Sequence, residues 1–478
     1  MIKQINTRIN SIIACLLITA SVFAQATNRS KQPNIIFIIA DDLGYADLGC
    51  YGQQKTETPN IDQLSKKGLK FTQFYAGTSV CAPSRTSFMT GLHTGHTVVR
   101  GNKSFEPEGQ TPLPDSVVTI ANLLQKKGYN TAAFGKWGLG YITTSGDPNK
   151  KGFDRFYGYN CQSLAHNYYP DHLWDNHQRI DIPENETKDA VYSADKIHEQ
   201  AMQFIADQNK DKPFFLFLPY TLPHGDVIAP HDSVYYYYIK KFNEKALTPP
   251  ANTKKGKVSF EPYPHAAFAA MVSRLDKYTG EVLSAVKKKG FEENTLIIFC
   301  SDNGPHKENG GDPEYFGNNG IYRGIKRDLY EGGIRVPFIA YWKGKIKPGV
   351  TDMPAVLWDM YPTLQQLSGM PITKNIDGIS ILPTLLQNGT QKLHDHLYWE
   401  FHENNGRQAV RWKNWKAVKL NVNNAAQTIL ELYDLASDPS EKNNLALQHP
   451  DIVQKMEAMI KADHVANKDW PLLSAEKQ

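Results

Sequence analysis

The sequence predicts an α/β fold: a large, mostly parallel sheet with helices on both faces, plus a small C-terminal antiparallel sheet with one helix. One observation is a set of short, continuously apolar runs, typical of strands buried on both faces of a parallel sheet. Another is that helical patterns ending in glycine separate these runs. The third is a change near residue 390, after which the strands are short and of mixed polarity.

Length and composition support two domains. The chain has 478 residues, of which 41% are hydrophobic and 21% charged, so it can bury a sizeable core. Length favours a large domain with a smaller one, predicted at residues 25–390 and 391–478. The net charge of +4 is too small to favour a nucleic-acid partner.

The first 24 residues have the pattern of a secretory signal peptide. Lys3 and Arg8 precede an apolar run at 12–23, and Ala24 offers a small residue for cleavage. No other stretch approaches the roughly 20 apolar residues of a membrane span. We therefore expect a mature chain without a membrane span, exported to the periplasm or secreted.

The predicted large domain alternates strands and helices. Continuous apolar runs predict buried strands at 34–40, 130–134, 213–218, 295–300 and 336–341. Helical patterns cover 119–127 and 265–289, and each is followed by a glycine that can end a helix. This order predicts an open α/β sheet.

The predicted small domain is antiparallel. Strand patterns lie at 397–401, 407–412, 415–420 and 428–433. A tight turn at 404–406 joins the first two, and a helix is predicted from 450 to 464.

Cysteine is sparse outside the signal segment. Only Cys50, Cys81, Cys161 and Cys300 remain there, which is not a disulfide-dense framework. Whether Cys50 and Cys161 pair is left open by the sequence.

Polar residues follow four of the predicted strands where each strand ends. Ligands of open α/β sheets bind outside the carboxyl ends of the strands, so these side chains should share one site. They are Asp41 and Asp42, Lys136, His224, and Asp302 with Asn303.

The acidic members of this group indicate a metal. Asp41, Asp42, Asp302 and Asn303 offer hard oxygen ligands, which suit Ca²⁺ or Mg²⁺ better than zinc. Adjacent carboxylates would repel one another unless a cation lay between them.

The stretch 81–91 reads as a short helix. Pro83 suits the first turn and Gly91 ends the helix, which places Cys81 at the N-terminus. Backbone N–H groups and the helix dipole favour an anion there. A thiol in this place is either a reactive nucleophile or a buried small hydrophobe, and position alone leaves both open.

The pattern Cys81-x-Pro83-Ser84-Arg85, closed by Thr90-Gly91, resembles the signature of type I sulfatases in the alkaline-phosphatase-like superfamily, of the exported bacterial polysaccharide type. In that family a maturation enzyme oxidises the cysteine to formylglycine, and the hydrated aldehyde is the nucleophile. The resemblance implies hydrolysis of a sulfate ester on a sugar of a sulfated polysaccharide or oligosaccharide.

The resemblance also implies a role for each site residue. Ca²⁺, with Mg²⁺ as the alternative, would be held by residue 81 together with Asp41, Asp42, Asp302 and Asn303. Arg85 would hold the nucleophile, and Lys136 and Lys326 would bind sulfate. His224 would protonate the leaving oxygen.

One position departs from the family. Many sulfatases read Gly-Lys-Trp-His-Leu-Gly, where the histidine helps to deprotonate the formylglycine hydroxyl during sulfate release. This chain has Gly138 instead. His93, His96 and His306 are the nearest candidates to replace it, and the sequence leaves the base open.

Contacts with the sugar are predicted from three residues. Arg100 follows the signature helix, His166 opens an aromatic, histidine-rich stretch at 166–174, and His306 follows the Asp302 strand end. The sequence leaves open which sugar and hydroxyl are used, whether chains are cut at ends or within, and the oligomeric state.

Two other functions fit the sequence less well than sulfate ester hydrolysis. A phosphoesterase of the same superfamily usually presents Ser or Thr and a second metal, which the Cys81 context disfavours. A non-catalytic sulfated-glycan binder would follow if Cys81 stayed a thiol, but the complete metal set and both lysines disfavour it.

Overall fold

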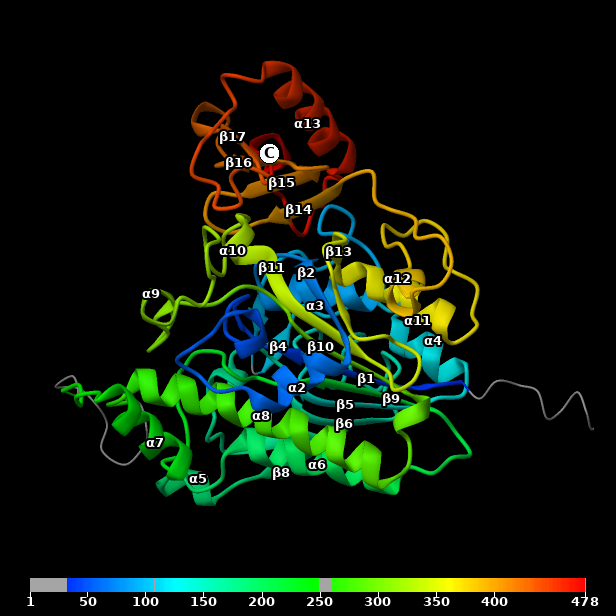
Figure 1. The fold of residues 1–478 in the computed structure, drawn as a ribbon, viewed down its shortest axis with the longest axis vertical. Coiled ribbons are helices and arrows are strands. Elements are labelled where there is room, and N and C mark those ends of the chain that lie inside the picture. Colours follow the sequence, from blue (N-terminus) through cyan, green and yellow to red (C-terminus); the bar gives the residue numbers. More distant parts are fainter. Residues whose placement is uncertain (1–31, 107, 249–259, 478) are drawn as a thin grey trace, which may run out of the picture.

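The computed structural model describes residues 32–106, 108–248 and 260–477, so the predicted signal peptide lies outside it. A mixed sheet of eleven strands runs through the molecule, in the order β12-β2-β11-β10-β1-β9-β5-β6-β7-β8, with β13 beside β2 (Figure 1). Its strands are β1 Asn34–Ala40, β2 Leu69–Tyr75, β5 Asn130–Lys136, β6 Arg155–Tyr159, β7 His172–Asp175, β8 Gln178–Asp181, β9 Phe214–Pro219, β10 Thr295–Ser301, β11 Arg335–Tyr341, β12 Gly349–Thr351 and β13 Ala355–Val356.

Helices cover both faces of this sheet, as the sequence predicts. One face packs against α2 Pro59–Lys67, α6 Ser193–Asp207, α7 Ser233–Phe242 and α8 Pro264–Lys288. The other face packs against α3 Cys81–Thr90, α4 Ile120–Lys126, α11 Met360–Leu367 and α12 Leu382–Leu386. Short helices lie in the loops: α5 Glu184–Thr187, α9 Pro313–Phe316 and α10 Glu331–Ile334, while β3 Ser104–Phe105 and β4 Gly109–Gln110 pair separately.

The strand β1 explains why an unbroken apolar run predicts this position. Ile36 and Ile38 point into the core on one face, and Ile35, Phe37 and Ile39 point into the core on the other. Both neighbours, β9 and β10, run parallel to β1. Every side chain of the strand is buried, so no alternation of polarity remains.

The strand β11 is present where the sequence predicts it, but its direction differs from that of a parallel strand. It runs antiparallel to β10. The sequence does not predict this direction, because an apolar run indicates burial on both faces of a strand but not which way the strand runs. The residues that precede β11 therefore lie at the same edge as those that follow β1 and β10.

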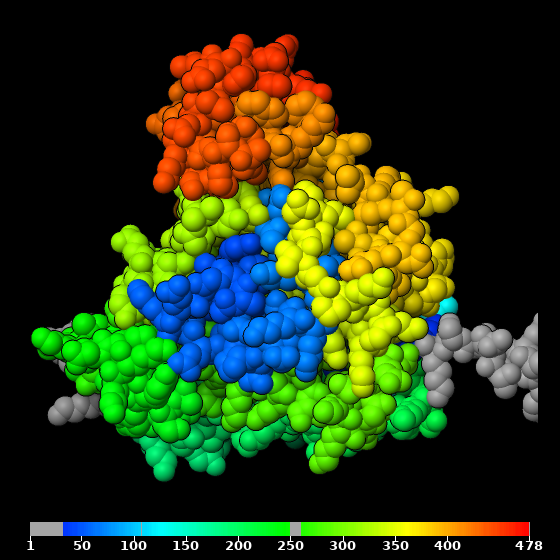
Figure 2. Space-filling model, viewed as in Figure 1, coloured from blue at the N-terminus to red at the C-terminus, as the bar shows by residue number. Residues whose placement is uncertain are grey.

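The C-terminal region has the predicted antiparallel sheet. Its strands are β14 Leu397–Phe401, β15 Arg407–Trp412, β16 Trp415–Leu420 and β17 Ile429–Asp434, followed by α13 Pro450–Asp463. Trp399 and Phe401 pack one face against Tyr75 and Trp358 of the large part. The helix covers the other face, and the C-terminal residues gather at one end of the molecule (Figure 2).

Two further findings bear on the sequence predictions. Cys50, Cys81, Cys161 and Cys300 are all free thiols, so a Cys50–Cys161 bond is not formed. Among the described residues, no helix combines the length and apolar character needed to cross a membrane.

Candidate active site

The acidic residues after β1 and β10 converge at the carboxyl edge of the sheet. The backbone N–H of Asp42 donates to Asp302 Oδ1 at 3.2 Å, and Asn303 Nδ2 donates to Asp42 Oδ1 at 2.6 Å. Asp42 has a φ of 62°, and this break in the extended backbone lets it and Asp41 approach one site from adjacent positions. Asp41, Asp42, Asp302 and Asn303 are fully buried.

Cys81 begins α3 and faces this acidic group. Its Sγ donates to Asp41 Oδ1 at 3.1 Å and lies 3.6 Å from Lys136 Nζ. Asn102 Oδ1 accepts from the Ala82 N–H at 3.2 Å, which satisfies one of the free donors at the start of the helix. Burial, followed by the charge of Asp41, raises the pKa of the Cys81 thiol well above its ordinary value. As a plain thiol Cys81 is therefore uncharged and hydrogen-bonded.

Arg85 lies one helical turn beyond Cys81 and is fixed by two carboxylates. Its Nη2 is 3.2 Å from Asp41 Oδ2 and 3.0 Å from Asp302 Oδ2. Its Nη1 also donates to the Lys136 carbonyl. Lys136 Nζ in turn lies 2.7 Å from Asp41 Oδ2. Burial would raise the pKa of Asp41, but neighbouring cations, with Lys136 first, hold it well below its ordinary value.

Lys326 and His224 complete the site from two other directions. Lys326 Nζ is 2.9 Å from both Asp42 Oδ2 and Glu308 Oε2, and it donates to His224 Nε2 at 3.3 Å. Lys326 reaches this edge because the chain then enters the antiparallel strand β11. Burial, and then the charge of Lys136, lowers the pKa of His224 well below its usual value. His224 Nδ1 is buried, and none of the described residues forms a hydrogen bond with it.

The oxygen atoms of this site fit a hard divalent cation. Asn303 Oδ1 is buried and accepts no hydrogen bond from the residues that the structure describes, although its Nδ2 is bonded. Burial, and then the negative charge of Asp41, raises the pKa of Asp302 to about 7. Three converging carboxylates and a spare amide oxygen are the donor set that Ca²⁺ and Mg²⁺ prefer.

The predicted sugar contacts have different environments. The His166 ring lies 4.3 Å from the His224 ring, edge to face, so it borders the site. His306 is buried beneath it: Nε2 donates to the Pro223 carbonyl at 3.1 Å, and Nδ1 accepts from the Glu308 N–H at 3.1 Å. His306 therefore supports the loop that carries His224.

Arg100, predicted to contact the sugar, contacts the C-terminal part of the chain. Its guanidinium is 2% exposed and lies 3.3 Å from Glu400 Oε2. It also donates to the carbonyls of Thr97 at 2.9 Å and Val465 at 2.7 Å. Arg100 thus ties the large part of the chain to the C-terminal sheet.

The two other histidines considered as bases are also engaged elsewhere. The His93 and His96 rings stack with centroids 4.1 Å apart, and His96 Nδ1 lies 3.0 Å from Asp377 Oδ1. His93 Nδ1 accepts from the Gly95 N–H at 3.1 Å. They form a group around Asp377 and not around Cys81.

Sequence reasoning missed Glu308, which pairs with Lys326 and also contacts Arg327. Burial would raise the pKa of this carboxyl group, but the charge of Lys326 and the hydrogen bonds from Lys326 and Arg327 outweigh burial and lower the pKa to about 2. Glu308 does not follow a strand directly, so strand-end reasoning could not select it.

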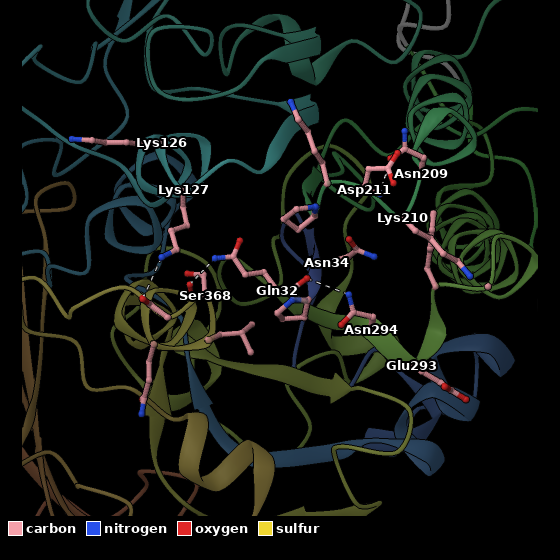
Figure 3. Close-up of a pocket in the computed structure, with 18 residues that line it drawn as sticks. Gln32, Asn34, Lys126, Lys127, Asn209, Lys210, Asp211, Glu293, Asn294 and Ser368 are labelled. Atoms are coloured by element: carbon pink, nitrogen blue, oxygen red, sulfur yellow. Dashed lines mark hydrogen bonds between the residues drawn. The ribbon is translucent and has the colours of Figure 1, made fainter. Parts of the chain in front are cut away.

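A large cavity lies at the other edge of the sheet. It measures about 1090 Å³ and is lined by the residues that enter β1 and β9, with Lys126 and Lys127 at its side (Figure 3). Gln32 Nε2 donates to the Ser368 carbonyl there at 3.1 Å. The cavity contains none of the acidic, cationic or thiol groups described above, so we place the chemistry at the carboxyl edge.

Family models match most of the chain. The model described as "Sulfatase" matches residues 33–370. A second, described as "N-sulphoglucosamine sulphohydrolase, C-terminal", matches residues 317–466.

Curated relatives and solved structures give the same result. Human arylsulfatase A is 31% identical, with 90% of this chain and 87% of the relative covered. An N-acetylgalactosamine-6-O-sulfatase of Bacteroides thetaiotaomicron is 28% identical, with coverages of 91% and 93%. The crystal structure of Ps i-CgsB, also solved in complex with k-i-k-neocarrahexaose, is 29% identical, with coverages of 94% and 96% and a TM-score of 0.76. The chain therefore belongs to the sulfatase family and is a sulfuric ester hydrolase.

Proposed function

We propose that this sulfatase hydrolyses a sulfate ester on a sugar of a polysaccharide or oligosaccharide, using a formylglycine made from Cys81 by a maturation enzyme and a bound divalent cation, Ca²⁺ in the first place. The observation that carries the proposal is the position of Cys81 at the start of α3, 3.1 Å from Asp41 and 3.6 Å from Lys136. The sugar is inferred from relatives, including the N-acetylgalactosamine-6-O-sulfatase and the Ps i-CgsB complex.

Two groups would add chemistry that no side chain of the chain supplies. The cation, held by Asp41, Asp42, Asp302 and Asn303, would stabilise negative charge as a Lewis acid. Formylglycine would supply a hydroxyl nucleophile on a carbon that can expel sulfate without an attack by water.

The cationic side chains bind and orient the ester. Lys136, at the end of β5, and Lys326, in the loop between β10 and β11, provide fixed positive charge for the sulfuryl oxygens. Arg85 is held by Asp41 and Asp302, so it keeps the start of α3 and the acidic group in a fixed relation.

His224 is the proton donor for the leaving sugar oxygen in this proposal. In the free protein it is neutral, since burial and Lys136 lower its pKa. The negative charge of a bound sulfate ester favours the protonated imidazole. Lys326 Nζ lies 3.3 Å from His224 Nε2 and would reach the same oxygen as a second donor.

We expect His224→Ala to lower kcat for a sulfated sugar by about 10²- to 10⁴-fold, the usual contribution of a general acid. The loss should be much smaller with 4-nitrophenyl sulfate, because nitrophenolate leaves without a proton. Steady-state kinetics with both substrates measure this difference. His177→Ala, at an exposed histidine paired with Asp147, should change neither rate. Equal losses with both substrates would contradict a proton-donating role.

Mass spectrometry of the natively produced protein tests the modification. Conversion of cysteine to formylglycine lowers the mass of the peptide containing residue 81 by about 18 Da, since a thiol becomes an aldehyde. The intact mass also reports whether residues 1–24 were removed on export, as we propose. A fully retained thiol in active protein would refute the formylglycine proposal, and a thiol without sulfate release would favour a glycan binder.

A further inference from the structure

Two amide side chains lie beside Gly138, the position where the sequence departs from related sulfatases. Asn160 directly follows β6, and Gln162 lies two residues further along. In the sheet Lys136 is paired with Tyr159, and the Gly138 N–H donates to the Asn160 carbonyl at 3.0 Å. Both residues therefore leave β6 at the edge where Lys136 leaves β5 and contacts Cys81.

Three polar atoms of these two amides lack hydrogen-bond partners in the part of the chain that the structure describes. Asn160 is fully buried, and neither its Oδ1 nor its Nδ2 has a hydrogen-bond partner among the described residues. Gln162 is 6% exposed, and its Nε2 is likewise buried and unpaired. Burying an amide without hydrogen-bond partners is unfavourable and uncommon in native proteins. Two such amides, Asn160 and Gln162, in one loop therefore indicate a bound group that supplies the missing partners.

Gln162 also fills the space above Gly138. Gly138 has a φ of 71°, which disfavours a side chain, and a Cβ there would lie 2.3 Å from Gln162 Nε2. The Gln162 amide thus occupies the space that the first atoms of a side chain at position 138 would fill. His93, His96 and His306 are held by other groups, so none of them supplies an imidazole to this place.

The same loop closes one side of the site. After Gln162 the chain forms a short 3-10 helix, Leu164–His166, whose last residue places its ring 4.3 Å from His224. Residues 160–166 therefore reach from Gly138, next to Lys136, to His224, next to Lys326.

We propose that Asn160 and Gln162 bind the sulfuryl group of the substrate through their amide N–H groups, and that Gln162 takes the place of the imidazole found in related sulfatases. This inference rests on the proposed function. A sulfuryl group carries a negative charge spread over oxygen atoms, and fixed, buried N–H donors match it. Because an amide does not take up a proton in the neutral pH range, Gln162 holds the group and does not act as a base.

The test compares wild-type protein with Asn160→Ala and Gln162→Ala. Each substitution is expected to lower kcat/KM for the fastest wild-type substrate by about 10²-fold, the usual effect of removing one oxyanion donor. Each should weaken the binding of inorganic sulfate, measured by isothermal titration calorimetry, by about tenfold. Gln203→Ala, at an exposed glutamine on α6 that bonds Asp207, should match wild type in both measurements.

Thermal unfolding separates substrate binding from a structural role. Since the Asn160 amide has no hydrogen-bond partner within residues 32–106, 108–248 and 260–477, Asn160→Ala should not lower the midpoint of unfolding. A lowered midpoint with unchanged sulfate binding would assign Asn160 to folding and overturn the proposal for it. Gly138→Ala should displace the Gln162 amide and weaken sulfate binding as Gln162→Ala does.

The two measurements keep this inference apart from the proposed function. If the wild type releases no sulfate from any ester, but both variants bind inorganic sulfate more weakly than the wild type, the amide sites stand and the proposed reaction fails. If both variants hydrolyse and bind like wild type, the amide sites fail while the reaction stands. A wild-type protein without measurable sulfate binding would also overturn the inference.

Discussion

Replacing Cys81 by alanine is expected to lower kcat for sulfate release by about 10⁴-fold or more, the scale seen when an enzyme loses its nucleophile. Alanine keeps the start of α3 intact, because it is a good helix former and Cys81 Sγ makes only polar contacts within the site. The carboxylates and the two lysines stay in place, so substrate binding should persist while chemistry stops. Rate measurements at saturating substrate, together with sulfate binding, separate these two effects.

Cys50→Ala is the matched control for this prediction. Cys50 is a second free cysteine, half-buried at the short helix 49–51, and its backbone N–H donates to Asp62 Oδ1. Because Cys50 lies beside Asp62 of α2 and not beside Cys81, its removal should leave kcat within about twofold. If Cys81→Ala retained a tenth or more of wild-type activity, residue 81 would not be the nucleophile and the reaction would need a different attacking group.

The fold was predictable where burial leaves a clear pattern. The apolar run of β1 matches its observed bounds, because both of its faces are buried and its neighbours are parallel. The same reasoning found β11 but not its direction, which depends on the loop from residue 302 to 334 returning the chain to the same edge. That path is set by tertiary contacts and leaves no periodic signal.

The site was predictable to the extent that strand ends define it. Four site residues lie at or just beyond the carboxyl end of a strand, and the geometry of the sheet brings them together. They are Asp41, Lys136, His224 and Asp302. Arg100 could not be placed in this way, because its partner Glu400 lies 300 residues away in the C-terminal sheet. Asn160 and Gln162 carry no charge and match no motif, so only their burial without partners reveals them.

Removing the metal should abolish activity and destabilise the protein. Asp41, Asp42 and Asp302 are fully buried carboxylates, and a cation bound only by the folded state stabilises it by about 2.7 kcal/mol at a concentration 100 times its dissociation constant. After prolonged treatment with a chelator, we expect sulfate release to stop and the midpoint of thermal unfolding to fall by about 5 °C. Metal analysis of the protein before and after treatment checks that the ion has left.

Adding single metal ions back to the metal-free protein identifies the bound ion and tests its ligands. Because all the proposed ligands are oxygen atoms, Ca²⁺ or Mg²⁺ should restore both activity and midpoint, whereas Zn²⁺, which favours nitrogen and sulfur, should not. Asp302→Asn should weaken this recovery by removing a ligand charge and loosening Arg85, whose Nε lies 3.0 Å from Asp302 Oδ2. Asp181→Asn, at an exposed aspartate paired with Arg179, should recover like wild type. Full activity in protein shown to be free of metal would mean that Arg85, Lys136 and Lys326 balance the buried carboxylates, and that the spare oxygen of Asn303 has another partner.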